Sequence, residues 1–233
     1  SSITVNRGDY EVEVLYKDVG GKVVDWEVCR YTGTPSDPPS IAHYDADGNP
    51  KNGPEGWHKK FVTVQDGTVR LGYRDAGNHR VAVDLGYSDI VCTPLDEDGV
   101  MADTSEFDAF VWKCMMKPQF LAAVFSRGAV FDACAVEVLL MAADYYCKEG
   151  EDGGDVFANL PVSPSMADRF PGIIGWDVIK YGVGRKPVAV NGVARCLYGY
   201  DDSGELVLVL EYDAEGNRLT QPEYNNDFDI NLD

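Results

Sequence analysis

The chain has 233 residues, 45% of them hydrophobic and 25% charged, so it can bury a core and has the composition of a soluble globular protein. Its formal net charge of −19 disfavours contact with nucleic acid or anionic lipid over most of the surface. The start of the chain has no apolar leader, and the most apolar run, 129–147, carries three acids. We therefore expect no signal peptide, no transmembrane segment and no membrane partner.

The six cysteines are widely spaced and form no CxxC pair, a pattern that is typical neither of a zinc site nor of a small disulfide scaffold. They indicate reduced thiols in an intracellular protein, either cytoplasmic or incorporated in a particle. No P-loop, GxGxxG or HExxH motif occurs. The sequence therefore predicts no cofactor and no metal.

Residues 1–98 have the alternation of antiparallel sheet, with expected strands at about 10–16, 23–31, 60–65, 68–74 and 79–85. Asp66-Gly67 forms a two-residue turn that pairs Val64 with Val69 and Val62 with Leu71, and so buries one face. A second turn at 76–78 would place Tyr73 opposite Val81 and Leu71 opposite Val83. The stretch 32–58 is dense in Pro, Gly, Asn and Asp and predicts a long loop.

Residues 99–150 predict a helical block of two to three helices. Asp103 and Glu106 resemble a capping box before an apolar stripe that includes Phe107 and Val111. Pro118 ends or kinks this helix. Further helices are expected at about 119–127 and 129–147.

Residues 151–187 predict a long irregular segment, and residues 188–233 predict antiparallel strands followed by an acidic tail. Asn191-Gly192 is a strong type I′ turn signal. The expected fold class is α+β, with antiparallel sheets from both ends of the chain around a central block of helices. One compact unit is expected, and an arrangement in two lobes is the alternative.

One phrase occurs twice, as YDADGNPKNGPE at 44–55 and as YDAEGNRLTQPE at 212–223. Asp, Asn and Gly are turn residues, so both copies are interpreted as turns, and the flanking sequence does not extend the match to a duplicated domain. Asp45, Asp47 and Asn49 offer an alternative calcium loop, which is disfavoured because Gly48 falls at position four instead of six. The octapeptide YDAEGNRL resembles the tyrosine–aspartate repeat unit of Rhs-type toxin shells; no function is transferred from it.

Few residues suggest catalysis. A cysteine hydrolase would pair His43, His58 or His79 with a thiol such as Cys29 or Cys134, and no nucleophile elbow supports this. Glu137 and Asp144 share one stripe of the apolar run and would need partners there. The sequence favours a non-enzymatic protein, with an enzyme as the alternative.

Two charged regions are candidates for binding. Arg70, Arg74 and Arg80 project from the polar face of the predicted meander, with Lys59 and Lys60 near its start, and could bind an anion or an acidic partner. The alternative is cross-strand pairing with Asp66, Asp75 and Asp84. The C-terminal segment, including Asp227, Phe228 and Asp229, would bind a basic protein surface or add a strand to a neighbour.

The first functional hypothesis is a non-enzymatic interaction or assembly subunit, a structural component of a larger complex such as a phage or virus particle, with other protein subunits as partners. In it, the basic meander of one copy meets the acidic tail of another. The second is an acidic inhibitor or immunity-type protein that covers a basic enzyme site. The third is a hydrolase or transferase with a His or Cys site on a loop.

Overall fold

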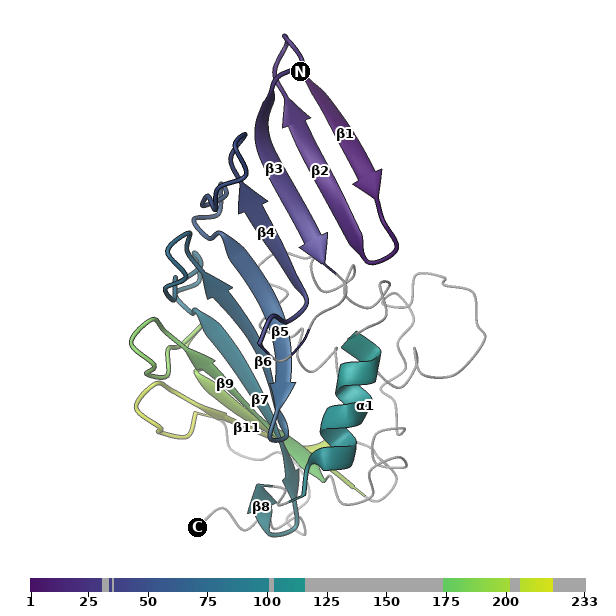
Figure 1. Cartoon of the computed structure of the whole chain (residues 1–233). Helices are drawn as coiled ribbons and strands as arrows, with labels where there is room; N and C mark the ends of the chain where they lie inside the picture. The colour runs from purple at the N-terminus through teal and green to yellow at the C-terminus, as the bar shows by residue number, and fades with distance from the viewer. Residues whose placement is uncertain (31–33, 35, 101–102, 116–173, 202–205, 220–233) are drawn as a thin grey trace.

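The computed structural model describes residues 1–30, 34, 36–100, 103–115, 174–201 and 206–219 (Figure 1). Ten strands lie in one antiparallel sheet in the order β1 to β7, β9, β10 and β11, and short β8 pairs with β7. Their bounds are β1 (Ser2–Arg7), β2 (Glu11–Lys17), β3 (Val23–Arg30), β4 (Ser40–Tyr44), β5 (Lys59–Gln65), β6 (Thr68–Arg74), β7 (Asp89–Asp96), β8 (Gly99–Val100), β9 (Gly175–Tyr181), β10 (Arg195–Tyr200) and β11 (Leu206–Tyr212).

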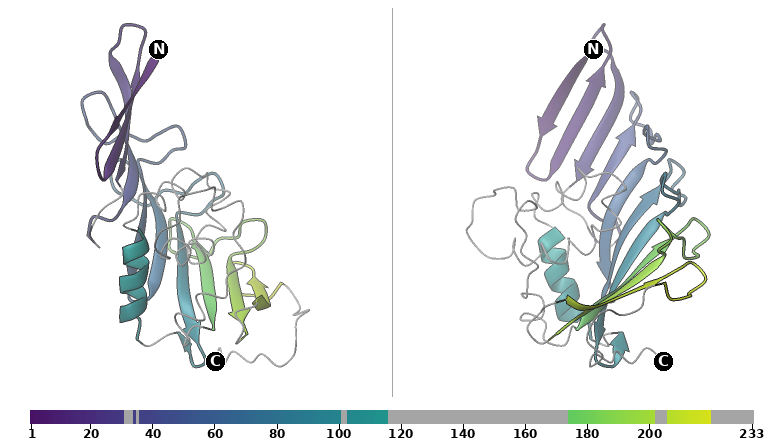
Figure 2. Two further views of the ribbon diagram at one scale, coloured as in Figure 1. Left: turned by 90° about the vertical axis from the view of Figure 1, so that its right-hand side faces the viewer. Right: turned by 180° about the vertical axis from the view of Figure 1, so that it is seen from behind.

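The predicted α+β class is wrong, because the fold is mainly a single sheet. Within the described residues the one helix is α1 (Ser105–Met115), which amounts to 5% of the chain, in place of a central helical block. The predicted helices at 119–127 and 129–147, and most of the irregular segment 151–187, lie outside the described residues. The end of that segment is not irregular, because it forms β9, and the predicted loop 32–58 contains β4. The two ends of the chain contribute to one continuous sheet, and the strands β1–β3 extend beyond α1 (Figures 1 and 2).

The predicted hairpin around Asp66-Gly67 is confirmed. Val64 pairs with Val69 and Val62 with Leu71, as one buried face requires. The predicted strand at 79–85 is wrong, since β6 pairs instead with β7, where Leu71 lies opposite Ile90. The chain between β6 and β7 forms a long loop instead of a three-residue turn. Within this loop the chain first folds back, so that Arg80 forms a bridge with Arg74, and it then enters β7.

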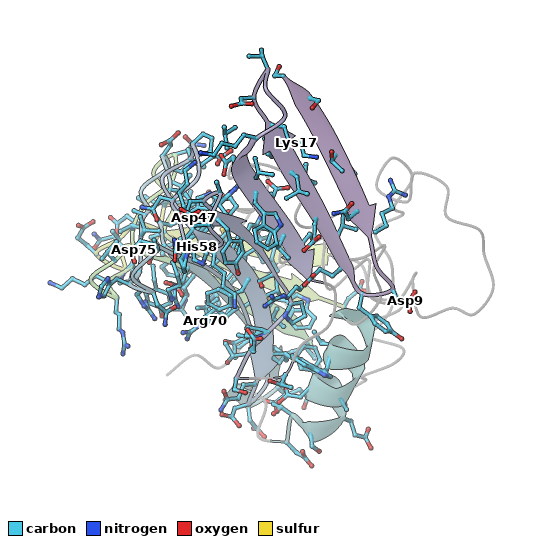
Figure 3. All side chains as sticks on the ribbon, turned by 45° about the horizontal axis from the view of Figure 1, so that its top comes forward. Asp9, Lys17, Asp47, His58, Arg70 and Asp75 are labelled. Atoms are coloured by element: carbon cyan, nitrogen blue, oxygen red, sulfur yellow. The ribbon has the colours of Figure 1, made fainter. Side chains whose placement is uncertain are left out.

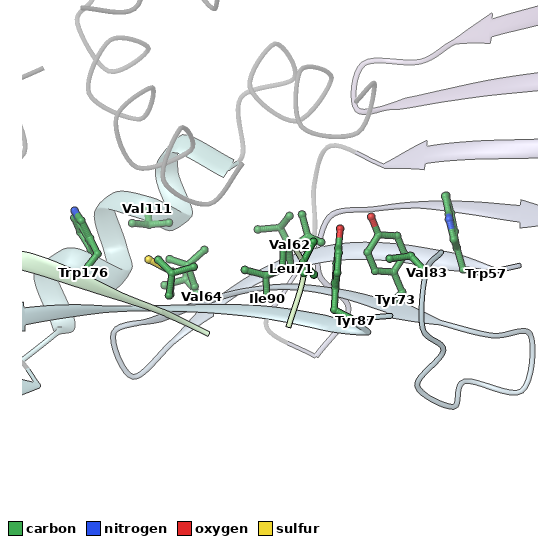
Figure 4. Close-up of a cluster of buried hydrophobic side chains, with 14 of the residues drawn as sticks. Trp57, Val62, Val64, Leu71, Tyr73, Val83, Tyr87, Ile90, Val111 and Trp176 are labelled. Carbon is green, nitrogen blue, oxygen red and sulfur yellow. The ribbon is translucent and has the colours of Figure 1, made fainter. Parts of the chain in front are cut away.

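One face of the sheet forms the main core. Side chains alternate between the faces of a strand, so Val62, Val64, Val69, Leu71 and Tyr73 all lie on the same side and are buried. The helix α1 covers part of this face with Phe107 and Val111; Val111 is labelled in Figure 4. A smaller cluster lies on the opposite face of the C-terminal strands, formed by Leu95, Leu197, Leu208 and Leu210.

One carboxylate caps the start of α1, and a second ties the helix to the β5–β6 turn. Asp103 accepts hydrogen bonds at its Oδ1 from the Ser105 N–H (3.1 Å) and the Ser105 hydroxyl (2.8 Å), which satisfies the start of the helix. Asp108 accepts a hydrogen bond from the Gly67 N–H at 2.9 Å. A Cβ atom at Gly67 would approach the Thr104 side chain too closely, so this turn and the helix fit only with glycine there.

The loops that follow β4, β6, β9 and β11 share one backbone skeleton and lie in a row at the same end of the sheet (Figure 1). Each begins with an isolated bridge between two residues six positions apart. The four bridges are Tyr44–Pro50, Arg74–Arg80, Tyr181–Pro187 and Tyr212–Arg218. Strand, loop and strand thus form a repeated hairpin of about 30 residues, which is the spacing of the first two and of the last two bridges.

The repeated phrase is therefore confirmed as turn chemistry. Asp45 Oδ1 accepts hydrogen bonds from the N–H groups two and four residues later, and Asp75 and Asp213 do the same in their loops. Two of these turns are close neighbours, as the labels on Asp47 and Asp75 show in Figure 3. The loop after β9 has Gly182 in place of the aspartate and keeps the same backbone hydrogen bonds. This copy of the loop therefore cannot be recognised from sequence similarity to the repeated phrase.

The strand β9 lies directly beside β7, although the chain between Asp96 and Gly175 separates them in sequence. Because the hairpin repeat continues across this point, the intervening chain is an insertion between two repeats. No helix in the described part of the chain is long and apolar enough to cross a membrane.

Replacement of Leu71 by alanine should lower the free energy of unfolding by roughly 2–5 kcal/mol, because the side chain is fully buried at the centre of the main core. Urea denaturation would measure the change. The control is Leu219→Ala, at a leucine that is 49% exposed and should tolerate the change. An equal loss in both variants would contradict the assignment of the core.

The stability of the loops should fall in acid. Hydrogen bonds from the residue four positions later contribute to a lowered pKa, below the ordinary 3.8, in three carboxyls: Asp45, Asp75 and Asp213. A lowered pKa in the folded state gives stability that is present above the unfolded value and is lost as the pH falls through the folded value. Replacement of all three by asparagine keeps the turn acceptor, so denaturation between about pH 4 and pH 2 should depend less on pH than in the wild type.

Candidate functional site

The structure brings together the three arginines that the sequence placed on one face. Arg70 and Arg74 lie on β6 and project opposite to Val69 and Leu71, and Arg80 comes from the loop that follows β6. Arg70 is labelled in Figure 3. We call these three side chains, together with Arg185 from the loop after β9, the arginine cluster.

Asp89 lies beneath the arginine cluster and is the acid that the sequence reasoning missed. Its side chain is 1% exposed, and its two oxygens lie 3.3 Å from Arg74 Nη2 and 3.2 Å from Arg80 Nη1. The Ser88 hydroxyl donates a further hydrogen bond to Asp89 Oδ2 at 2.8 Å. These donors fix the buried carboxylate of Asp89 in place.

Room for this carboxylate comes from Gly72, which pairs with Asp89 across the strands. A Cβ atom at Gly72 would lie 2.7 Å from the Phe61 ring and 3.0 Å from Asp89 Oδ1. The same Phe61 ring supports Arg74, whose guanidinium lies 4.8 Å from the ring centre. Arg74 also donates to the Tyr73 carbonyl at 2.6 Å, so its orientation is fixed on three sides.

The cluster carries more positive charge than Asp89 can balance. Burial lowers the pKa of Arg80, and repulsion from Arg74, Arg185 and Arg70 lowers it further, against the opposing effect of Asp89. Only two of these four guanidiniums, those of Arg74 and Arg80, contact the buried carboxylate. Arginine stays charged near neutral pH, so the excess charge remains and suits an anion.

The other predicted basic residues do not join the cluster. Lys59 lies opposite Arg74 on β5, but its Nζ pairs with Asp37 at 3.1 Å. Lys60 projects to the core face, where it is 2% exposed and its Nζ lies 5.8 Å from the centre of the Tyr73 ring. A single step along a strand separates the two faces, which is why adjacent lysines diverge.

The alternative pairing is not observed. None of the ion pairs within the described residues joins the three arginines to Asp66, Asp75 or Asp84. Asp75 serves its turn instead. The acid that pairs with the arginines is Asp89. The sequence feature that indicates it is a lone acid at the start of the apolar run IVCTPL. Arg185 was missed because its loop follows a strand that was not predicted.

Residues proposed for other roles lie apart from the arginine cluster. Asp227, Phe228, Asp229 and Cys134 lie outside the described residues. His43, the most buried of the three histidines, lies on β4, whereas His79 is largely exposed. In the described ranges no group of three His, Cys, Asp or Glu side chains could hold a metal ion. The arrangement can bind a carboxylate, phosphate or sulfate by charge-assisted hydrogen bonds.

Replacement of Asp89 by asparagine should destabilise the fold by roughly 3 kcal/mol, because it leaves partly buried guanidiniums without their counter-charge. Sulfate should restore part of the loss, and should restore more than it adds to the wild type. Thermal unfolding with and without sulfate measures both effects. In the control Asp37→Asn, which removes an exposed ion pair, neither effect should exceed about 1 kcal/mol.

Comparison of the chain with protein-family models, with curated proteins and with solved structures finds no match in any of the three. The function is therefore argued from the site alone.

Proposed function

We propose that the chain is a non-enzymatic assembly subunit whose arginine cluster binds the acidic C-terminal segment of another copy. The observation that carries the proposal is the unbalanced positive charge on one face of a protein with a net charge of −19. A surface of opposite sign to the rest of the molecule directs a partner to one place and one orientation.

The acidic segment supplies the complementary charge. Residues 201–233 contain ten acids and one arginine, and their last part places aromatic and aliphatic residues between the acids. Carboxylates fit the planar donor pattern of guanidinium groups. A contact between two different surfaces is head-to-tail, so repeated use of it extends an assembly.

The geometry separates the arginines by their roles. Arg74 and Arg80 contact Asp89 directly, so they maintain the fold as well as the charge. Arg70 and Arg185 contribute positive charge, and neither side chain forms an ion pair or hydrogen bond among the interactions of the described residues. These two are therefore the residues to replace, because their loss should change binding more than stability.

A fluorescent peptide of residues 222–233 is the probe for this proposal. Binding to the wild-type protein, followed by fluorescence anisotropy, should weaken steeply as salt is raised. In the double variant Arg70→Gln/Arg185→Gln, binding should weaken at least about tenfold at low salt, because two charge-assisted hydrogen bonds are lost. The mass in solution, measured by light scattering, should fall with the same salt dependence.

The matched control is Lys17→Gln/Lys22→Gln, which removes the same charge from the β2–β3 hairpin, away from the arginine cluster. It should bind the peptide nearly as well as the wild type. Equal weakening in both double variants would show attraction by net charge alone and would contradict a site. A monomer at all salt concentrations that ignores the peptide would contradict the assembly.

A further inference from the structure

On the face of the sheet opposite the arginine cluster, a buried histidine lies between carboxylates. His43 on β4 pairs across the strands with Glu27 on β3, and its ring packs against Trp57 with 4.6 Å between the ring centres. Glu55 comes from the same loop as Trp57. We call Asp25, Glu27, His43, Glu55 and Trp57 the His43 site.

The backbone does not require an imidazole at this position. Tyr73 takes the corresponding place in the next hairpin repeat, as the backbone hydrogen bonds His43–His58 and Tyr73–Ser88 show. Both side chains are buried, and Tyr73 packs on Tyr87 much as His43 packs on Trp57. Figure 4 shows Trp57, Tyr73 and Tyr87 along this face. The first repeat thus has an imidazole ring, which titrates near neutral pH, where its neighbour has a phenol.

One ring nitrogen of His43 lacks a hydrogen-bond partner. The side chain is 8% exposed, and Nε2 is buried with no partner in the described part of the molecule. Nδ1 lies 3.9 Å from a Glu27 oxygen and Nε2 lies 4.0 Å from a Glu55 oxygen, both too far for hydrogen bonds. Only glycine at position 53 leaves room for this ring, because a Cβ atom there would lie 2.6 Å from it.

The surroundings of this nitrogen are acidic. Burial raises the pKa of Glu27, and Glu55 and Asp25 raise it further. The pKa of Tyr16 is raised by burial and by these same three carboxylates, which shows that they gather around one point. Among the ion pairs of the described residues, Lys51 balances Asp25 at 3.3 Å. Glu27 and Glu55 therefore have no cation of their own.

An organic cation satisfies these groups together. Burial lowers the pKa of His43, so the ring is neutral near pH 7. A proton on Nδ1 would face Glu27 and leave Nε2 as an acceptor. A guanidinium donates several hydrogen bonds in one plane, stacks on aromatic rings and pairs with carboxylates. A metal ion is disfavoured, because no set of three ligands with suitable geometry exists within the described residues.

We infer that the His43 site binds the arginine side chain of a basic partner, with Nε2 of His43 and the carboxylates of Glu27 and Glu55 as acceptors. Glu55 is 60% exposed, so solvent reaches this carboxylate, whereas Nε2 of His43 is itself buried. The inference does not depend on the arginine cluster, since it concerns the other face and an opposite charge. Its test can fail while the proposed function stands.

The probe is N-acetyl-arginine amide, followed by chemical shifts of the His43 ring and by Trp57 fluorescence. N-acetyl-citrulline amide has the same shape without the charge and should bind at least about tenfold more weakly. Glu55→Gln should weaken binding of the arginine probe about tenfold as well. Glu215→Gln, which removes an equal charge from the exposed loop after β11, should leave it unchanged.

A second variant separates the acceptor from the packing. His43→Phe keeps an aromatic ring on Trp57, as Tyr73 does on Tyr87, and should fold but lose binding about tenfold or more. Equal binding of the arginine and citrulline probes would overturn the inference. So would unchanged binding in Glu55→Gln, or binding of zinc chloride at His43 together with no response to the arginine probe.

The affinity should also depend on pH. The groups that face His43 are Glu27 and Asp25 from β3, Glu55 and Lys51 from the loop, and His58. The arginine probe should bind more tightly at neutral pH than in acid, because the lowered pKa of His43 leaves Nε2 unprotonated near pH 7. Binding should decrease as the pH falls and these groups take up protons. A rise in affinity in acid would contradict the assigned acceptors.

Discussion

The register between β5 and β6 determines what every other strand presents on each face. Val62 opposite Leu71 fixes the side that is buried, and a slip of one residue would turn Arg70 and Arg74 into the core and Leu71 into water. The cost of such a slip is far above the gain from any single ion pair. Both candidate sites depend on this choice, because the arginine cluster and the His43 site lie on opposite faces of one sheet.

Prediction from sequence succeeded where side chains alternate and the turn is short. The strands around Asp66-Gly67 were predictable because a two-residue turn leaves one register that buries all the valines. It failed at β7, where Asp89 and Pro94 interrupt the alternation and a long loop leaves the register open. It failed again in the fold class, since the helical signals near α1 and at 129–147 outweighed the weak strands β4 and β9. The pairing of Arg74 and Arg80 with Asp89 depends on the β6–β7 register, and the sequence alone does not determine that register.

The hairpin repeat separates architecture from chemistry. Its backbone hydrogen bonds are the same with aspartate at the turn or with Gly182, so the skeleton does not depend on the phrase that makes it visible in the sequence. The buried position at the loop base holds His43 in one repeat, Tyr73 in the next and Lys180 in a third, all nearly inaccessible to solvent. A scaffold that tolerates three such different groups at one place can acquire separate binding sites without a change of fold.

The direct pairing of β7 with β9 has a consequence for the kinetics of folding. Every other ladder among the described strands joins strands that are neighbours in the chain, so these ladders can form by local closure. The β7–β9 ladder closes the long chain between Asp96 and Gly175, and each doubling of such a loop costs only about 0.6 kcal/mol at equilibrium. The long loop therefore slows folding more than it lowers the stability of the folded state. The N-terminal strands can assemble first and expose β7 as a template, and the last three strands complete the sheet by adding to its edge.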